Sequence, residues 1–537
     1  MRKILSVFLV LTLLLVSFSS LSMAGTEAVR SDNALTKILY ERVDNPELWL
    51  EYIANASEDS LGRWLPELIR KVSKGSNEES KKLVDVSYTT ITQGYDWGPA
   101  IQGVVIHFNE PIDSSEIDEN IFEVKSVRNF KDFSFKTFSF AEEASDHVSK
   151  REIINAYVSD SQGNLVENGN NITLELKVGP NLTEGSPFKY NVATSYNEYV
   201  KTSYDISIKP GQSIPALSGN TLVFQPTDAD NYEADLQIRS DAFDHNQPFT
   251  HEGVDLLYAS YAPEIVEDEN ASKPLVIWLH GAGEGGEDTT IPLLGNEAAN
   301  LVSDEYQEFF GENGAYVLVP QNKTVWMDVD GTRTYASDVE DSNGESYYTE
   351  ALMALIDDFV KNNPSIDQNR IYIGGASNGG YMTVNMAASY PEYFAAAFPI
   401  CAPYLPEWIT DERVDAMLGV PIWFTHALTD AVVKVAEGEG GMFDYQPTLD
   451  EDGNPMLLDL NTNALYNRLV SAGHESVYYS RFDKVEDTSG KYFKEDGVTP
   501  HEYMGHWSWI YTLNNECVEN INGEEVSIFQ WLGQQSN

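Results

Sequence analysis

Ser377 lies in the segment Gly-Ala-Ser-Asn-Gly at residues 375–379, between an apolar run (371–373) and a stretch with a helical pattern (381–390). A serine on a sharp turn between a strand and a helix is the arrangement of a nucleophile elbow, in which glycines let the strand and the helix approach closely. The segment therefore predicts that Ser377 is a nucleophile able to attack an acyl carbonyl.

A glycine-rich loop at residues 280–286 follows another apolar run, which is typical of a buried parallel strand. Backbone N–H groups of such a loop can stabilise the oxyanion that forms when a serine attacks a carbonyl. We predict that Ala282 and Asn378 donate these N–H groups, with residues 281 and 283 as alternatives to Ala282. A loop without any ligand is the other interpretation.

Asp430 and His506 are the candidates to activate the serine. Asp430 follows the strand-like run 421–426, and only His474, His501 and His506 come after it. The α/β-hydrolase fold orders these groups as serine, acid and histidine. We predict His506 because it follows a loop and directly precedes a helix-like stretch. His474 is expected at a helix end, and His501 is an alternative.

These residues together predict an acyl-enzyme mechanism. Ser377 attacks, His506 accepts its proton and returns it to the leaving group, and Asp430 orients the imidazole. Trp326 is a candidate to line the substrate pocket, although packing in the core is the alternative. The sequence has no Cys/His cluster with zinc spacing, and we expect neither a metal nor a cofactor.

Several segments resemble one group of α/β-hydrolases, the predicted peptidases related to polyhydroxybutyrate depolymerases and feruloyl esterases. They are Leu-His-Gly-Ala-Gly (279–283), Gly-Ala-Ser-Asn-Gly-Gly (375–380), Pro-Glu-Tyr-Phe (391–394) and Gly-His-Trp-Ser-Trp (505–509). The chain is most similar to EstA-type secreted esterases, since Gly-Tyr-Asp-Trp-Gly-Pro-Ala (94–100) resembles their immunoglobulin-like domain.

The resemblance covers residues 84–537. It implies a carboxylesterase with the triad Ser377, Asp430 and His506 and no cofactor. It also implies an N-terminal domain that borders the active site and helps the chain to form a homo-oligomer.

The predicted function is an exported serine carboxylesterase for short-chain acyl esters. A feruloyl or acetyl esterase acting on plant polysaccharide, or a serine peptidase, would use the same residues. A non-catalytic surface or carbohydrate-binding protein is the alternative from another class, and the presence of Ser377, Asp430 and His506 argues against it.

The chain of 537 residues carries 84 acidic and 34 basic side chains, a net charge of −50. Such a surface repels nucleic acid and anionic membranes. The excess of acid serves either solubility or growth in high salt. The two cysteines, Cys401 and Cys517, exclude a disulfide scaffold, but one bridge and two free thiols are both open.

The pattern along the chain predicts four segments. Residues 1–24 read as a signal peptide, with a retained membrane anchor as the alternative, and residues 25–80 as helices. Residues 84–210 contain short β-branched runs typical of an immunoglobulin-like β-sandwich. After a linker at 210–219, residues 220–537 alternate strands and helices, as in an α/β hydrolase with a mostly parallel sheet. No stretch after the leader is long enough to span a membrane.

Overall fold

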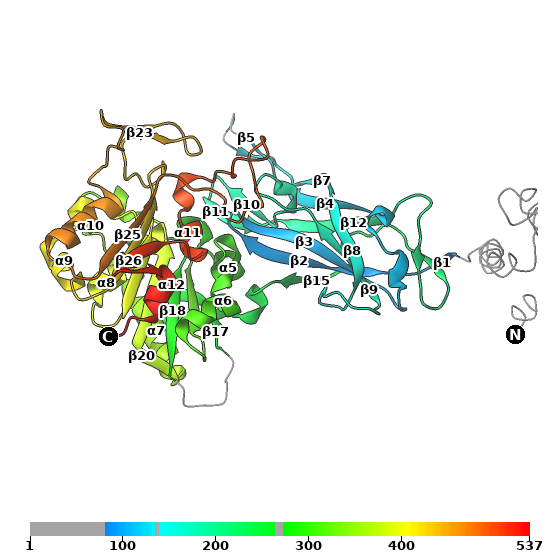
Figure 1. Cartoon of the computed structure of the whole chain (residues 1–537), viewed down its shortest axis with the longest axis horizontal. Coiled ribbons are helices and arrows are strands. Elements are labelled where there is room, and N and C mark those ends of the chain that lie inside the picture. The colour runs from blue at the N-terminus through cyan, green and yellow to red at the C-terminus, as the bar shows by residue number, and fades with distance from the viewer. Residues whose placement is uncertain (1–80, 135–136, 138, 264–271) are drawn as a thin grey trace, which may run out of the picture. The chain divides into compact units, whose positions relative to one another are not determined.

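The computed structural model describes residues 81–134, 137, 139–263 and 272–537. The predicted signal peptide (1–24) and helical segment (25–80) lie outside the described residues. The chain divides into two compact units, and the larger one comprises residues 85–212 and 224–537. It contains the sandwich and the hydrolase domain (Figure 1).

The smaller unit is described only at residues 81–84 and 213–223. Here β1 (Lys81–Leu83) pairs in parallel with β14 (Thr221–Val223), which pairs with β13 (Ile214–Pro215). The linker that we predicted at 210–219 therefore contains a short strand, β13, because these residues pair with β14, which follows them closely in the chain and is itself held by β1.

The sandwich consists of two sheets. The larger has the strand order β15-β2-β3-β9-β8 and the smaller the order β12-β4-β7. Their bounds are β2 (Ser87–Tyr95), β3 (Gly98–His107), β4 (Phe122–Phe130), β7 (Ser145–Arg151), β8 (Ile153–Ser159), β9 (Asn171–Leu176), β12 (Lys201–Ile208) and β15 (Tyr232–Gln237). The Tyr88 hydroxyl accepts a hydrogen bond from the Tyr204 N–H at 2.9 Å, so the two sheets are joined in the core.

Strands β4 and β7 of the sandwich lack the sequence pattern from which a strand is predicted. Along β4 the buried positions include Ser126 and Arg128, and β7 is mostly exposed. Polar residues at inward positions break the alternation of apolar and polar residues by which a strand is recognised.

The boundary between the two domains also differs from the prediction. Strand β15 pairs in parallel with β2, so the sandwich continues to residue 237 and the hydrolase domain does not begin at 220. Most of β15 is exposed or half-buried and carries two acids, which in sequence is indistinguishable from a loop.

The hydrolase domain is built on an eight-stranded sheet with the order β16-β17-β19-β18-β20-β21-β22-β25. β16 and β17 are antiparallel to their neighbours, and the remaining strands are parallel. The bounds are β16 (Asp244–His251), β17 (Val254–Tyr261), β18 (Lys273–Leu279), β19 (Tyr316–Asn322), β20 (Ile366–Ala376), β21 (Ala396–Ile400), β22 (Ile422–Ala427) and β25 (Val477–Phe482).

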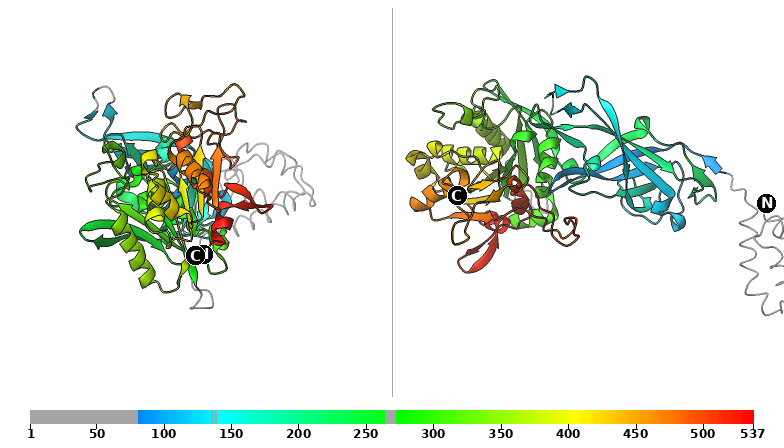
Figure 2. Two further views of the ribbon diagram at one scale, coloured as in Figure 1. Left: turned by 90° about the vertical axis from the view of Figure 1, so that its left-hand side faces the viewer. Right: turned by 90° about the horizontal axis from the view of Figure 1, so that it is seen from above.

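Helices cover both faces of this sheet (Figure 2). Along β18, Leu275 and Ile277 belong to one core cluster, whereas Val276 and Trp278 belong to the other. The first cluster includes residues of α7 (Thr349–Asn362), α8 (Asn378–Ser389), α9 (Asp411–Met417) and α10 (Asn461–Ser471). The second includes residues of α5 (Thr290–Gly295), α11 (Trp509–Leu513) and α12 (Ile528–Gly533).

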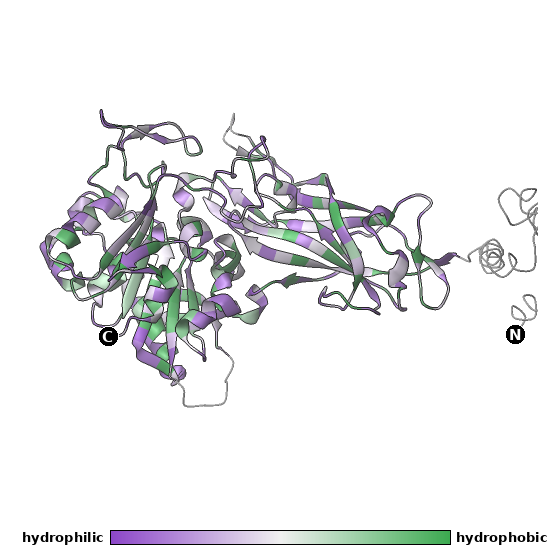
Figure 3. Cartoon of the chain, in the orientation of Figure 1, coloured by the Kyte–Doolittle hydropathy of each residue, from purple (hydrophilic) through white to green (hydrophobic). Residues whose placement is uncertain are grey.

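Because both faces are covered, the central strands are apolar along their length, as Figure 3 shows for the middle of this sheet. The predicted fold class, an immunoglobulin-like domain followed by an α/β hydrolase, is thus confirmed for the described residues. Within these residues no helix combines the length and the apolar character needed to cross a membrane.

Candidate active site

Ser377 occupies the turn between β20 and α8. Its backbone has φ 54° and ψ −114°, and its N–H donates to the Ile400 carbonyl oxygen at 2.9 Å. A positive φ in a residue other than glycine costs on the order of 1–3 kcal/mol and persists where the surrounding structure enforces it. The strand, turn and helix predicted around Ser377 are all present.

Two glycines make this turn possible. A methyl group added to Gly375 or to Gly379 would overlap the carbonyl oxygen of Leu279, the last residue of the neighbouring strand β18. Only glycine allows β18, β20 and α8 to converge this closely. This close approach places the glycine-rich loop that follows β18 next to Ser377.

Three side chains from distant parts of the chain form one line of hydrogen bonds. His506 Nε2 lies 2.9 Å from Ser377 Oγ, and His506 Nδ1 lies 2.8 Å from Asp430 Oδ2. His506 comes from η12 (Gly505–Trp507), and Asp430 follows β22. An ionised carboxylate only accepts hydrogen bonds, so the Nδ1 proton of His506 faces Asp430 and its Nε2 lone pair faces the serine hydroxyl.

Asp430 is fully buried and accepts four hydrogen bonds. The N–H groups of Val432 and Val433 both donate to Oδ1 at 2.8 Å, while His426 Nε2 lies 3.0 Å from Oδ2, which also faces His506. Burial alone would raise the pKa of Asp430, but the charge of His506 and the hydrogen bonds from both histidines hold it below its usual value.

The pKa of His506 is shifted in the opposite direction. Burial alone would lower it, but the charge of Asp430 outweighs burial and raises the pKa of His506 well above 6.5. The arrangement therefore stabilises a positive charge on this imidazole, so that His506 can accept a proton from the serine.

His426 is a neighbour of the site that sequence reasoning missed. Its ring is fully buried between Asp430, the Val433 carbonyl oxygen at 2.9 Å and Thr462 Oγ1 at 3.0 Å. Its Nε2 contacts the same oxygen of Asp430 as His506 does, and it helps to hold this carboxylate in place. Its position four residues before Asp430, at the end of an apolar strand, is the signal that could have identified it.

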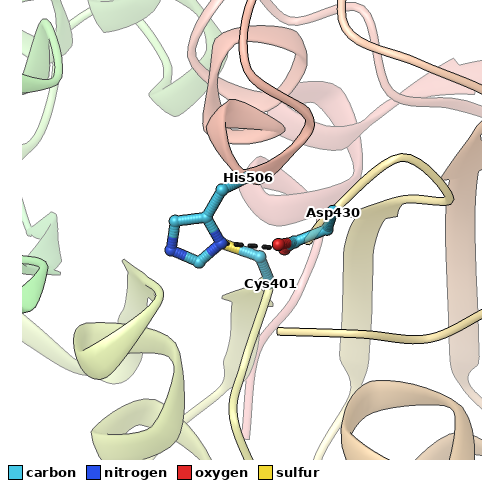
Figure 4. A group of neighbouring side chains, drawn as sticks. All are labelled: Cys401, Asp430 and His506. Atoms are coloured by element: carbon cyan, nitrogen blue, oxygen red, sulfur yellow. Dashed lines mark hydrogen bonds and ion pairs between the residues drawn. The ribbon is translucent and has the colours of Figure 1, made fainter. Parts of the chain in front are cut away.

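Cys401 also lies beside the hydrogen-bonded pair (Figure 4). Its sulfur and the ligand atoms of Asp430 and His506 lie within 4.8 Å of one another, the one such set of three potential metal ligands in the described part of the chain. Cys401 and Cys517 are both free and buried, so the structure does not contain the bridge that the sequence left open.

The glycine-rich loop contains the short helix η7 (Ala282–Glu284). A methyl group built on Gly281 would lie 4.0 Å from Ser377 Cβ, so the loop borders the serine. The Gly281 N–H already donates to Glu284 Oε2 at 2.8 Å, which removes Gly281 as an alternative oxyanion donor. Ala282 and Asn378 are the first residues of η7 and α8, and the N–H of a first helical residue has no acceptor inside its own helix.

His280 holds the loop from the strand side. Its Nδ1 donates to the Gly281 carbonyl oxygen at 2.7 Å, and its Nε2 accepts the Asn322 N–H at 3.4 Å. Complete burial lowers the pKa of His280 to about 4, so the ring is neutral at pH 7. The motif at residues 279–283 includes His280 but predicted no role for it.

Trp326 has no exposed surface. Its ring packs against His280 at 5.1 Å and Tyr348 at 5.9 Å between ring centres. The predicted substrate contact is therefore wrong, and the alternative of a packing residue holds. A single tryptophan in a loop carries no sequence signal that separates these two roles.

The other two late histidines lie elsewhere. His474 Nε2 lies 3.1 Å from the carbonyl oxygen of Met417, the last residue of α9, and 2.8 Å from that of Val420. It thus caps a helix end. The ring of His501 packs against Tyr503, and the backbone N–H of His501 donates to the Tyr492 carbonyl oxygen at 3.0 Å.

A hairpin of the sandwich domain reaches the glycine-rich loop. It consists of β10 (Phe188–Asn191) and β11 (Tyr196–Tyr199). The Tyr196 hydroxyl donates to the Thr324 carbonyl oxygen at 3.0 Å, and the Arg333 guanidinium lies 4.0 Å above the Tyr196 ring. A methyl group on Gly283 would lie 3.6 Å from the Tyr190 ring. The sandwich therefore supports one side of the loop beside Ser377.

Comparison with known proteins matches both domains. Residues 87–222 match the model of the esterase Ig-like N-terminal domain, and residues 261–444 match the phospholipase/carboxylesterase family. The chain combines an esterase immunoglobulin-like domain with a carboxylesterase-type α/β hydrolase. The two matches confirm the resemblance to esterases that was drawn from the sequence.

Individual relatives agree with this assignment. The chain is 29% identical over 143 residues to poly(3-hydroxyalkanoate) depolymerase C of Paucimonas lemoignei and 28% identical over 116 residues to acyl-protein thioesterase 1 of Eremothecium gossypii. These matches cover 25% and 22% of this chain and span only 29% and 48% of the two relatives.

A solved structure described as a thermostable esterase is similar over both domains. It has 26% identity and a TM-score of 0.62, and the match covers 84% of this chain and 100% of that one.

Proposed function

We propose that this chain is an exported serine carboxylesterase that hydrolyses short-chain acyl esters through an acyl-enzyme. The observation that carries the proposal is the hydrogen-bonded line from Ser377 through His506 to Asp430. The relatives named as a depolymerase, a thioesterase and an esterase support the reaction class.

In the first half of the reaction, His506 Nε2 removes the Ser377 hydroxyl proton while Oγ attacks the acyl carbonyl. Asp430 stabilises the imidazolium that forms. The Ala282 and Asn378 N–H groups donate to the oxyanion, and each such donor is worth on the order of 10²–10³ in turnover. His506 then gives the proton to the leaving alkoxide, and the acyl-enzyme remains.

In the second half, a water molecule takes the place of the alcohol. His506 removes its proton as it attacks the acyl-enzyme, and Ser377 leaves with that proton. The carboxylate product carries the same sign of charge as the surface of the enzyme, whose net charge is −50, and this favours its release.

The test is Ser377→Ala assayed on p-nitrophenyl acetate. We expect kcat/KM to fall on the order of 10⁶-fold, because the nucleophile is lost. Ser389→Ala, at the exposed far end of α8, is the matched control and should leave kcat/KM unchanged. A Ser377→Ala enzyme within tenfold of the wild type would refute the assignment.

Labelling with a fluorophosphonate separates an enzyme from a non-catalytic protein. A bound label located on Ser377 by peptide mass supports an active serine. Rates on acyl esters of increasing length, on feruloyl and acetyl polysaccharide esters and on peptides then identify the substrate class. Export is tested by sequencing the protein from the culture medium, which should begin at residue 25.

A further inference from the structure

Glu284 is a buried acid on the inner side of the glycine-rich loop. The side chain is 3% exposed, and its Oε2 accepts the Gly281 N–H at 2.8 Å and the Asn296 Nδ2–H at 3.0 Å. Asn296 follows α5, so one carboxyl ties the start of η7 to the end of α5. The bond from Gly281 is one half of a capping box, in which the third helical residue accepts the N–H of the N-cap residue; glycine has no side chain for the other half.

The carboxyl lies close to the nucleophile and has little room to move. A methyl group on Gly281 would lie 3.5 Å from Glu284 Oε2 and 4.0 Å from Ser377 Cβ, so a single residue separates the two. A methyl group on Gly295 would overlap Glu284 Oε1. Contact from both sides fixes the rotamer, and with it the direction of the Gly281 N–H.

We propose that Glu284 is the positioning residue of the oxyanion hole: by accepting the Gly281 N–H it turns this amide away from the substrate and leaves the Ala282 amide for the oxyanion. The proposal rests on the proposed esterase function. It assigns a role to an acid that touches neither the substrate nor the hydrogen-bonded line of Ser377.

The charge of Glu284 matters because of this position. Its Oε1 is buried and has no hydrogen-bond partner among the described residues, which is costly for a carboxylate and tolerable for a neutral acid. Burial raises the pKa of Glu284 to about 8, against the hydrogen bonds from Gly281 and Asn296, which lower it. The acid is therefore neutral at pH 7 and becomes charged as the pH rises through about 8.

A negative charge one residue from the developing oxyanion opposes it, since both charges lie in a poorly solvated region. The neutral acid does not. Turnover should therefore fall as the pH rises through the pKa of Glu284.

Other titratable groups lie on the elements around Glu284. They are His280 at the end of β18, Asp288 in the same loop, Glu297 beyond α5, Tyr190, Tyr196 and Arg333 at the sandwich hairpin, and His506 with Asp430 beyond Ser377. His280 is neutral throughout, and burial raises the pKa of Glu297 well above its usual value. None of these charges is a leading cause of the pKa shift of Glu284, which burial dominates.

The experiment compares Glu284→Gln, Glu284→Ala and the wild type on p-nitrophenyl acetate, from about pH 6 to about pH 9.5. Active sites are counted by fluorophosphonate titration. Glutamine keeps an oxygen for the Gly281 N–H but cannot ionise. We expect its kcat at pH 7 to stay within about threefold of the wild type and its decline near pH 8 to disappear.

Alanine removes the acceptor. We expect kcat per active site to fall on the order of 10–100-fold with KM little changed, because the interaction serves the transition state. Glu287→Gln is the matched control: this exposed acid of the same loop pairs with Lys323, and its removal should leave the profile unchanged.

The proposal is overturned if Glu284→Ala keeps the wild-type kcat, or if Glu284→Gln retains the decline near pH 8. If the alanine variant does not fold, the profile of the glutamine variant decides. Wild-type activity and labelling of Ser377 test the esterase function separately, so each of the two ideas can fail without the other.

Discussion

Asp430→Asn is the substitution whose effect follows most directly from the hydrogen bonds. In the wild type, the N–H groups of Val432 and Val433 both point at Oδ1. In the variant these two donors require an oxygen, so the asparagine carbonyl oxygen takes this position. The amide NH2 group is thereby placed where Oδ2 faces His506.

An NH2 group in this place moves the ring proton of His506 from Nδ1 to Nε2. Because the amide donates, Nδ1 of His506 must accept, and its proton moves to Nε2. A protonated Nε2 cannot remove the Ser377 proton. We expect kcat to fall on the order of 10⁴-fold, which corresponds to about 5 kcal/mol of activation free energy.

The pH profile provides an independent signature. In the wild type Asp430 raises the pKa of His506 well above 6.5, so activity is lost as the pH falls through a midpoint above 6.5. The variant lacks this charge, while the burial that lowers the pKa of His506 remains. The midpoint of the residual activity should therefore move below that of the wild type.

The assay is kcat/KM for p-nitrophenyl acetate as a function of pH, with melting temperature as the check on folding. Asp487→Asn is the control, since Asp487 is also buried but lies outside the hydrogen-bonded line, and it should retain the wild-type profile. An Asp430→Asn enzyme within tenfold of the wild type, or one with an unshifted midpoint, would show that Asp430 does not set the tautomer.

Three further predictions concern the glycine turn beside Ser377, the packing of Trp326 and the state of the two cysteines. Gly379→Ala should lower both the melting temperature and kcat, because its methyl group overlaps the end of β18; Gly419→Ala, where a methyl group meets no atom within 4 Å, should change neither. Trp326→Phe should lower the melting temperature and leave KM unchanged, because Trp326 is fully buried. An altered KM would show that Trp326 does contact the substrate. Denaturation in iodoacetamide without reductant should add two alkyl groups, at Cys401 and Cys517; a mass without them would reveal a bridge.

The local parts of the site were predictable because short-range physics specifies them. The glycines around Ser377 allow a turn that other residues would block, and the apolar runs before residues 280, 377 and 430 can be satisfied only by burial between two layers. The strands and helices predicted there coincide with β18, β20, α8 and β22 to within a few residues.

The parts that escaped prediction depend on distant partners. Strand β15 belongs to the sandwich only because β2 offers it an edge. Trp326 is a core residue because His280 and Tyr348 surround it. Glu284 looks in sequence like any acid, and its role comes from burial beside Gly281, just as the role of His426 comes from burial beside Asp430.

The sequence by itself determined which chemistry is available: a serine on a glycine-flanked turn, followed by an acid and then by three histidines of identical intrinsic chemistry. Only the tertiary structure decided that His506, 129 residues from Ser377 and 76 from Asp430, meets them both. The physical reason is that the sequence specifies where each histidine occurs, but not which groups lie next to it. The hydrogen-bond partners of His506 are determined by the parallel sheet, which brings the carboxyl ends of distant strands together.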